Sequence, residues 1–372
     1  MNAKPRIAIL GDFPLGKVTD RYETMNFNAG WLYCLFQLLQ EIDEFDIHWI
    51  IVDKNIKEYE QLEVGNQTFH VAPGTGLTVG QYTGYIYNRW QVSRIIRRIK
   101  PCLFHGWGTE RFYGLSTKDF HGKSLLSIQG ILTAYGQRAK ISSFECRQRF
   151  YEKIAIKSVD YITTESQWAR ERILEMSPKS KIFLWEYAPQ DIFFKITRNL
   201  SSTPSCLFAG THTPVKDVPT VVEAFSIPEL SHVKLYLAGV NPHSIPNLPA
   251  NIIPLGKVTR EEIARLLGAV WCLVHPSLAD SSPNIVKEAR VAGVPAIVTT
   301  ECGGKQYVEH GKSGFVIKSK SSDELAASVL DIVSSKERSL RMGEYKQDLC
   351  RQLLSLDTMK KGIINIYRDI IG

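Results

Sequence analysis

The sequence predicts an α/β protein made of two successive domains, each built on an open parallel sheet, that face each other. Three observations support this class. The 372 residues are too many for one ordinary hydrophobic core. Apolar runs of strand length alternate with helical patterns along the chain, which is typical of βαβ units. A polar stretch, residues 198–204, separates two such series and is the best candidate for a linker.

The first half contains five predicted strands with helices between them. The strands are RIAILG, IHWIIVD, CLFHGW, SLLSIQG and YITTES, which begin at residues 6, 47, 102, 124 and 161. Helical spacing of apolar residues appears near 29–41, 88–100, 144–158 and 167–176. We therefore expect a first domain over residues 1–197.

The second half repeats the alternation. The strands SCLFAG, KLYLAG, IIPLG, WCLVHPS and AIVTT begin at residues 205, 234, 252, 271 and 296. Helical patterns lie near 218–226, 259–269, 284–292 and 323–335. We expect a second domain over residues 204–357. The last stretch, TMKKGIINIYRDIIG, forms an amphipathic helix over 358–372 that we expect to pack back on the first domain.

Composition narrows the class of protein. No apolar run approaches the roughly 20 residues that a membrane span needs. The first apolar run is too short for a signal peptide, and the seven cysteines include no CxxC pair. We expect a cytoplasmic protein without structural disulfides or a bound metal.

The net charge of +7 is concentrated in one region. Residues 85–160 contain fourteen Lys or Arg and only five Asp or Glu. Such a region is typical of contact with an anionic membrane leaflet or a phosphorylated substrate, or it is an ordinary solvated surface. No nucleic-acid-binding motif accompanies it, so we expect no nucleic-acid partner. Peripheral contact with the inner face of the membrane stays open.

The stretch HPSLADSSPNIVKEARVAGVP, residues 275–295, carries the main candidate site. Ser282 suits the N-cap of a helix, and Pro283 suits its first position. The N–H groups of Asn284 and Ile285 then point out of the helix start, where they form a binding site for a diphosphate. Glu288 lies one turn further along the same face and could accept hydrogen bonds from a ribose diol.

This turn resembles that of the retaining glycosyltransferases with the GT-B fold, in particular the GT4 family, also called glycosyl transferases group 1. The family carries two acids separated by seven residues, here Asp280 and Glu288, followed by a helix of small residues and Gly293-Val294-Pro295. Residues 302–317, CGGKQYVEHGKSGFVI, resemble its Gly-Gly loop and next strand. The first acid of the family is usually Glu, so Asp280 is a departure.

The resemblance implies two Rossmann-like domains across a cleft and a role for each acid. Glu288 would hold the nucleotide ribose, and Asp280 would contact the transferred sugar. The amides of Asn284 and Ile285 would bind the distal phosphate, next to Ser282 and Pro283.

The stretch CLFAGTHTPVKDV, residues 206–218, resembles the second phosphate loop of the family. Gly210 and Lys216 match, and we expect Lys216 to stabilise the leaving diphosphate. Thr211 and His212 stand where the family has an arginine, and they are weaker donors. The base is expected near Ile253.

The first domain supplies fewer signals. Asn28-Ala29-Gly30 resembles the N-terminal glycine loop of the family, near the acceptor. His105 ends a strand at a position suited to the cleft, where a structural and a catalytic role are both open. Gln129 stands where some relatives carry a histidine that contacts the donor sugar.

We therefore predict a retaining, metal-independent hexosyltransferase that uses a UDP-, GDP- or ADP-linked sugar and no cofactor. The acceptor would be a sugar or a lipid-linked molecule, in polysaccharide or glycolipid biosynthesis. Two alternatives keep the fold but not this reaction: a nucleotide-sugar-binding protein without transfer activity, and a nucleotide-sugar epimerase.

Overall fold

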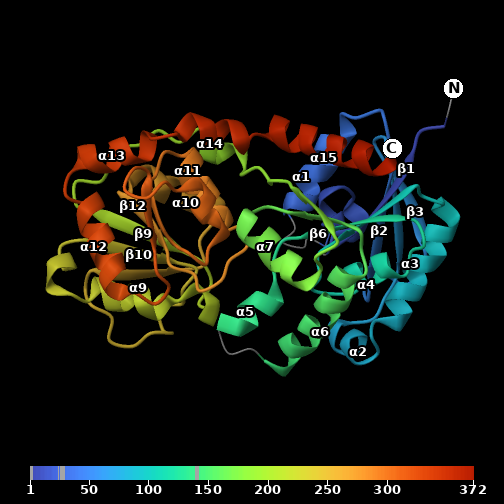
Figure 1. The fold of residues 1–372 in the computed structure, drawn as a ribbon, viewed down its shortest axis with the longest axis horizontal. Helices are drawn as coiled ribbons and strands as arrows, with labels where there is room; N and C mark the ends of the chain where they lie inside the picture. Colours follow the sequence, from blue (N-terminus) through green and yellow to red (C-terminus); the bar gives the residue numbers. More distant parts are fainter. Residues whose placement is uncertain (1–2, 24, 26–29, 139–141) are drawn as a thin grey trace.

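The computed structural model describes residues 3–23, 25, 30–138 and 142–372, and it contains two parallel sheets flanked by helices (Figure 1). The α/β class with two Rossmann-like units is confirmed.

The first sheet has the strand order β3-β4-β2-β1-β5-β6-β7-β8, and only β3 runs antiparallel to its neighbour. Its strands are β1 (Arg6–Leu10), β2 (Asp46–Asp53), β3 (Glu60–Val64), β4 (Gln67–Pro73), β5 (Leu103–Trp107), β6 (Lys123–Ile128), β7 (Tyr161–Thr164) and β8 (Lys181–Leu184). Its helices are α1 (Gly30–Gln40), α2 (Leu77–Tyr82), α3 (Ile86–Ile99), α4 (Tyr113–Lys118), α5 (Leu132–Arg138), α6 (Ser143–Lys157) and α7 (Gln167–Met176).

The second sheet has the order β11-β10-β9-β12-β13-β14 and is entirely parallel. Its strands are β9 (Ser205–Ala209), β10 (Lys234–Ala238), β11 (Ile252–Gly256), β12 (Cys272–His275), β13 (Ala296–Thr299) and β14 (Gly314–Ile317). Around it lie α8 (Asp191–Phe194), α9 (Val218–Phe225), α10 (Arg260–Ala269), α11 (Asn284–Val291), α12 (Ser322–Ile332), α13 (Lys336–Glu344) and α14 (Gln347–Leu353).

The order of the second sheet places the candidate site. The strand order reverses between β9 and β12, and ligands of open parallel sheets bind at such a switch point, beyond the carboxyl ends of the strands. The loop after β9 contains Lys216, and the loop after β12 contains Asp280. The fold therefore brings these two loops side by side.

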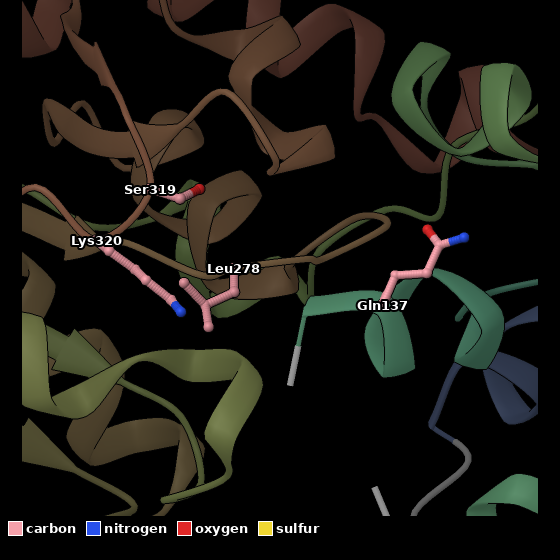
Figure 2. A pocket seen from close by; sticks show the side chains of 4 residues that line it. All are labelled: Gln137, Leu278, Ser319 and Lys320. Carbon is pink, nitrogen blue, oxygen red and sulfur yellow. The ribbon is translucent and has the colours of Figure 1, made fainter. Parts of the chain in front are cut away.

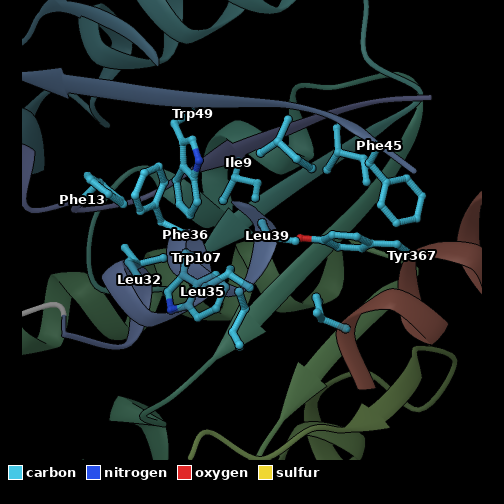
Figure 3. Packing of buried hydrophobic residues seen from close by; sticks show 14 of the residues in the cluster. Ile9, Phe13, Leu32, Leu35, Phe36, Leu39, Phe45, Trp49, Trp107 and Tyr367 are labelled. Carbon is cyan, nitrogen blue, oxygen red and sulfur yellow. The ribbon is translucent and has the colours of Figure 1, made fainter. Parts of the chain in front are cut away.

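The C-terminal helix α15 (Leu356–Ile371) packs against the first sheet (Figure 3). Its buried side chains, among them Ile363 and Tyr367, join a core that contains Ile9, Phe45 and Trp49. In Figure 1, α13, α14 and α15 run along one side of the molecule from the second sheet to the first. The short helix α8 already packs in the core of the second sheet, through Phe193. The domain limits at residues 197, 204 and 357 stay predictions.

The strands β3, β4 and β8 of the first sheet lack a prediction from the sequence. Strands β3 and β4 form a hairpin around Gly65 and Asn66, and β3 is the edge strand. Its sequence, EQLEV, is mostly polar, as edge strands that resist aggregation often are. The apolar signal used to find the other strands is therefore weak there.

No helix among the described residues is both long and apolar enough to span a bilayer.

Candidate functional site

Helix α11 begins one residue later than the sequence predicts. Pro283 is its N-cap, with an extended backbone, and the carbonyl of Pro283 accepts from the N–H of Val286 at 3.1 Å. The prediction that Ser282 is the cap and Pro283 the first helical residue is therefore wrong. Pro283 has a ψ of 118°, which is outside the helical range, so the first helical residue is Asn284. The hydroxyl of Ser282 is buried and has no hydrogen-bond partner in the described part of the chain.

The consequence for ligand binding is unchanged. Asn284 and Ile285 occupy the first two helical positions, whose N–H groups have no intrahelical acceptor. They lie at the positive end of the helix dipole.

Asp280 lies before this helix and is held by two partners. One carboxylate oxygen accepts a hydrogen bond from Nε2 of His275 at 3.0 Å and pairs with the ammonium of Lys216. Burial alone would raise the pKa of Asp280, but Lys216 and His275 together lower the pKa below its usual range. Asp280 is therefore ionised at neutral pH. The predicted acid and the predicted cation are in direct contact.

His275 is a site residue that the sequence reading missed. Its ring is fully buried, and Nε2 also lies 3.2 Å from the hydroxyl of Ser277. Burial and the nearby ammonium of Lys216 lower the pKa of His275, although Asp280 opposes this shift. The ring is neutral and donates its Nε2–H to Asp280. The sequence offered one signal for His275: it is the last residue of β12 and lies five residues before Asp280.

Glu288 is buried in α11 and uses only one of its oxygens. Its Oε1 accepts from Nη1 of Arg260 at 2.6 Å, while its Oε2 is buried without a hydrogen-bond partner among the described residues. Burial raises the pKa of Glu288 to about 7, although Arg260 lowers it. A buried oxygen without a partner indicates a missing ligand or water. Sequence patterns gave no reason to expect Arg260 here.

The loop after β9 carries the other predicted donor residues. Gly210 is bonded to the carbonyl of Ala238, and the alkyl chain of Lys216 lies across the face of Gly210. Thr211 and His212 are exposed, and Nδ1 of His212 lies 3.2 Å from the hydroxyl of Ser244. The structure thus directs Lys216, and not His212, toward Asp280.

Gly239 has a positive φ of 86° and allows the close approach of this loop, because a Cβ there would lie 2.6 Å from the carbonyl oxygen of Gly210. Ile253 lies in β11, two strands from β9. Arg260 follows this strand at the start of α10, so its contact with Glu288 joins the β11 side of the sheet to α11.

The site residues predicted in the first domain lie in different environments. Gly30 is the exposed first residue of α1, with open space above it, and Asn28 and Ala29 lie outside the described residues. The amide of Gln129 lies between two indoles, and its oxygen can accept from Trp31 at 2.8 Å and Trp107 at 3.2 Å.

His105 does not lie in the cleft. It is fully buried, with Nδ1 2.9 Å from the hydroxyl of Tyr367 and Nε2 2.7 Å from that of Ser127. Burial lowers the pKa of His105 to about 3, so the ring stays neutral. Both nitrogens are occupied inside the core, and the catalytic alternative for His105 is therefore wrong.

A buried ion cluster joins the two domains beside Glu288. Lys287 in α11 pairs with Glu165 and with Glu186 at 3.2 Å, both from the first domain, and lies 3.4 Å from the carbonyl of Tyr187. Burial alone would lower the pKa of Lys287, but the two carboxylates raise it above its usual value. The hydroxyl of Ser166 adds a hydrogen bond to the carbonyl of Ser281 at 2.5 Å. Helix α11 and the turn before it are thus fastened to the opposite domain.

A cavity of about 300 Å³ lies close to the turn between β12 and α11. Leu278, Ser319 and Lys320 of the second domain and Gln137 of α5 line it, as Figure 2 shows. Leu278 is two residues from Asp280, and its N–H is bonded to the carbonyl of Val215 in the phosphate loop. The cavity therefore opens between the domains next to the candidate site. Within the described ranges, no group of three or more His, Cys, Asp or Glu side chains is placed to hold a metal.

The comparisons with known proteins point to the same loops. Residues 190–349 match the family model described as "Glycosyl transferases group 1". This segment contains the phosphate loop, both acids and Arg260.

Two curated relatives match shorter parts of the chain. N-acetyl-alpha-D-glucosaminyl L-malate synthase of Bacillus anthracis is 26% identical over 167 residues, which cover 42% of this chain and 43% of that protein. GDP-mannose-dependent alpha-(1-6)-phosphatidylinositol monomannoside mannosyltransferase of Mycobacterium tuberculosis is 28% identical over 81 residues, 22% of this chain and 21% of that protein. The matches thus span less than half the length of these relatives.

Solved structures resemble the whole chain in fold. Sucrose-phosphate synthase from Thermosynechococcus elongatus has a TM-score of 0.75 at 14% identity and covers 99% of both chains. HepE of Anabaena, in complex with UDP-glucose, has a TM-score of 0.68 at 14% identity and covers 98% of this chain and 100% of its own. The finer GT4 assignment stays a prediction. Residues 190–349 are thus similar to the group 1 glycosyl transferases, and the chain that contains them has the two-domain GT-B fold.

Proposed function

We propose that this protein transfers a hexosyl unit from a nucleotide-diphosphate sugar to a hydroxyl acceptor, with retention of the anomeric configuration. One observation carries the proposal. Lys216, Asp280, the start of α11 and the unpartnered oxygen of Glu288 all meet at the switch point of the second sheet. This set combines a cation, free N–H groups and a carboxylate, which suit a diphosphate and the neighbouring ribose.

The donor would bind across this set of groups. The N–H groups of Asn284 and Ile285 and the ammonium of Lys216 would hold the diphosphate. Oε2 of Glu288 would accept a hydrogen bond from the ribose diol while Arg260 keeps Oε1. The base would lie toward Ile253 in β11, on the side from which Arg260 comes. The names of the relatives mention UDP-glucose and GDP-mannose, so the nucleotide stays open among UDP, GDP and ADP.

In the proposed reaction the acceptor oxygen bonds to the anomeric carbon on the face from which the diphosphate oxygen leaves. The bond from that carbon to the diphosphate breaks, and a phosphate oxygen of the leaving group takes the acceptor proton. No protein nucleophile is needed, because the protein orients the two substrates and stabilises the developing charge. Lys216 would turn from Asp280 to the leaving phosphate, and Asp280 would contact hydroxyls of the transferred sugar.

We also propose that no metal ion or cofactor takes part. Lys216 and the positive end of α11 would supply the charge that stabilises the diphosphate. Thr211 and His212, in place of the arginine of the family, would be secondary donors. The acceptor, a sugar or a lipid-linked molecule of polysaccharide or glycolipid biosynthesis, would approach from the side of Gly30 and Gln129.

The test is to incubate the purified protein with UDP-, GDP- and ADP-linked hexoses, with and without a panel of sugar and lipid-linked acceptors. Nucleotide diphosphate should appear only with an acceptor, in buffer with chelator. NMR of the product should show the anomeric configuration of the donor.

The other outcomes separate the alternatives. An inverted product would refute retention. Release of nucleotide diphosphate without an acceptor, together with an epimerised sugar, would indicate an epimerase. Donor binding with no turnover on any acceptor would indicate a binding protein.

A further inference from the structure

Exposed apolar side chains gather on one face of the first domain. They come from α2, from the start of α3 and from the first half of α6: Val79, Tyr82, Ile86, Tyr87, Trp90 and Phe150. Tyr82, Ile86 and Phe150 are 70%, 67% and 62% exposed, which is unusual for side chains of this size. We call this set the aromatic face.

Contacts hold α2 and the start of α3 against α6. The amide nitrogen of Gln148 in α6 donates to the hydroxyl of Tyr85, the N-cap of α3, at 3.3 Å. The guanidinium of Arg147 in α6 lies 4.6 Å from the ring centre of Tyr82 in α2, and its Nε bonds to Gln81 at 3.3 Å. The hydroxyl of Tyr151 donates to the carbonyl of Gln81 at 2.6 Å. Figure 1 shows α2 and α6 side by side at the same end of the first domain.

Arginines border the aromatic face. On α3, Ile86, Trp90, Arg94 and Arg97 follow each other at helical spacing, so apolar side chains at the start of the helix give way to cations at its end. The guanidinium of Arg94 lies 4.7 Å from the ring centre of Trp90, and Arg97 is exposed.

Acidic side chains are scarce around this face. Residues 77–109 contain five Lys or Arg and no Asp or Glu. The two acids of α6 are engaged within the protein: Glu145 caps its own helix, and Glu152 is buried and accepts from the N–H groups of Leu132 and Thr133. The surface is therefore apolar and positively charged.

We propose that the aromatic face and its arginines bind the surface of an anionic lipid bilayer. Trp and Tyr favour the boundary between acyl chains and headgroups, and Arg pairs with lipid phosphates. Separate side chains that protrude from three helices suit insertion among lipids. This inference goes beyond the proposed function and does not depend on it. The face adjoins α5, which packs on α6 and lines the interdomain cavity through Gln137, so a membrane-bound chain would present its cavity close to the bilayer.

Vesicle co-sedimentation of the purified full chain, without donor, tests the proposal. Vesicles of phosphatidylcholine with phosphatidylglycerol should bind the chain at low salt. Pure phosphatidylcholine should bind it at least about tenfold less, because the arginines lose their anionic partners. High salt should weaken binding to the mixed vesicles by screening these charges.

Two variants and two matched controls locate the surface. Arg94→Gln/Arg97→Gln should weaken binding about 25-fold, at about fivefold for each arginine. Tyr82→Ser/Ile86→Ser/Trp90→Ser should weaken it at least about tenfold through the lost apolar insertion. Lys336→Gln/Arg341→Gln and Leu349→Ser/Leu353→Ser remove exposed cations and exposed apolar groups from α13 and α14 and should leave binding unchanged. Circular dichroism of each variant confirms that it is folded.

Several results would overturn the proposal. One is no binding to anionic vesicles at low salt, and another is an equal loss in the control variants. A third is that light scattering shows a dimer that the variants of the aromatic face dissociate, while vesicle binding is unchanged. That result would mean that the aromatic face binds a second copy of this chain. Because donor is absent, a chain that binds vesicles but transfers no sugar would refute the proposed function alone.

Discussion

Asp280 shares one carboxylate oxygen between an ammonium and an imidazole, and this arrangement bears on how the site works. The neutral ring of His275 fixes the direction of Asp280 from inside the domain, where it is fully buried. Lys216 approaches from the loop side and is partly exposed. In the proposed reaction an entering diphosphate would compete with Asp280 for Lys216, while the bond from His275 would keep Asp280 in place.

We expect Lys216→Ala to lower kcat about 100-fold, because a cation that acts on developing charge contributes mainly in the transition state. The affinity for the donor should fall much less. Steady-state kinetics with a responsive acceptor gives kcat, and calorimetry gives the donor Kd. Lys257→Ala, an exposed lysine after β11, serves as the control. Equal losses in kcat and affinity would reduce Lys216 to a phosphate anchor.

Donor binding should depend on pH through Glu288. Its pKa is raised to about 7, so it is largely protonated at pH 6 and largely ionised at pH 8. Only the ionised form offers both oxygens as acceptors. If that form binds the ribose, donor affinity rises about tenfold from pH 6 to pH 8.

Calorimetry with an intact nucleotide sugar measures this, since its diphosphate does not titrate in that range. Glu288→Gln should bind more weakly at pH 8 and show a flat profile. If the donor affinity of the wild-type protein stays constant or falls as pH rises, Glu288 does not bind the ribose.

Among the helices, α15 follows the second domain in the sequence but packs in the core of the first sheet. Met359, Ile363, Ile366, Tyr367 and Ile370 recur at helical spacing and are all buried in the first core. Its amphipathic pattern predicts one buried face.

We expect Ile363→Ala to lower the free energy of unfolding of the first domain by about 2–5 kcal/mol, the usual range for truncation of a fully buried aliphatic side chain. Asn365→Ala, on the exposed face of the same helix, should change it by less than about 0.5 kcal/mol. Chemical denaturation followed by tryptophan fluorescence measures both. A small effect of Ile363→Ala would mean that α15 contributes little to the core.

The local parts of the site were readable from the sequence because their signals are local. Asp280, Asn284 and Glu288 lie within one strand-turn-helix unit, where spacing alone fixes which groups share a side. Lys216 follows a strand in the same way. The start of α11 was misplaced by one residue because both Ser282 and Pro283 fit a helix start.

The rest depends on partners distant in the chain. Arg260 with Glu288 and Lys287 with Glu165 join segments that no periodicity connects. The role of His105 stayed open because a polar ring at a strand end looks the same in a sequence whether it faces a cleft or a core hydroxyl such as that of Tyr367.

For the whole molecule, the cluster of Lys287, Glu165 and Glu186 sets how the domains meet. Lys287→Ala should lower the unfolding free energy by about 3–5 kcal/mol, because it leaves two carboxylates buried without their cation. Glu165→Ala should also destabilise the protein. The double variant should lose less than the sum of the single losses, with a coupling of about 1–3 kcal/mol.

Denaturation of the four proteins in this cycle measures the coupling. Lys305→Ala provides a partly exposed control, because its ammonium bonds to a carbonyl of its own domain. Additive losses would mean that Lys287 and Glu165 do not interact across the domains.

The chain passes between the domains twice, once between Tyr187 and α8 and once between α14 and α15. Two separate backbone connections restrict how the domains can move relative to each other. They oppose twisting and sliding of one domain against the other, and they leave one easy rotation, about the line that joins the two connections. An opening of the two domains would therefore be a rotation about that line, and the residues furthest from it would move most.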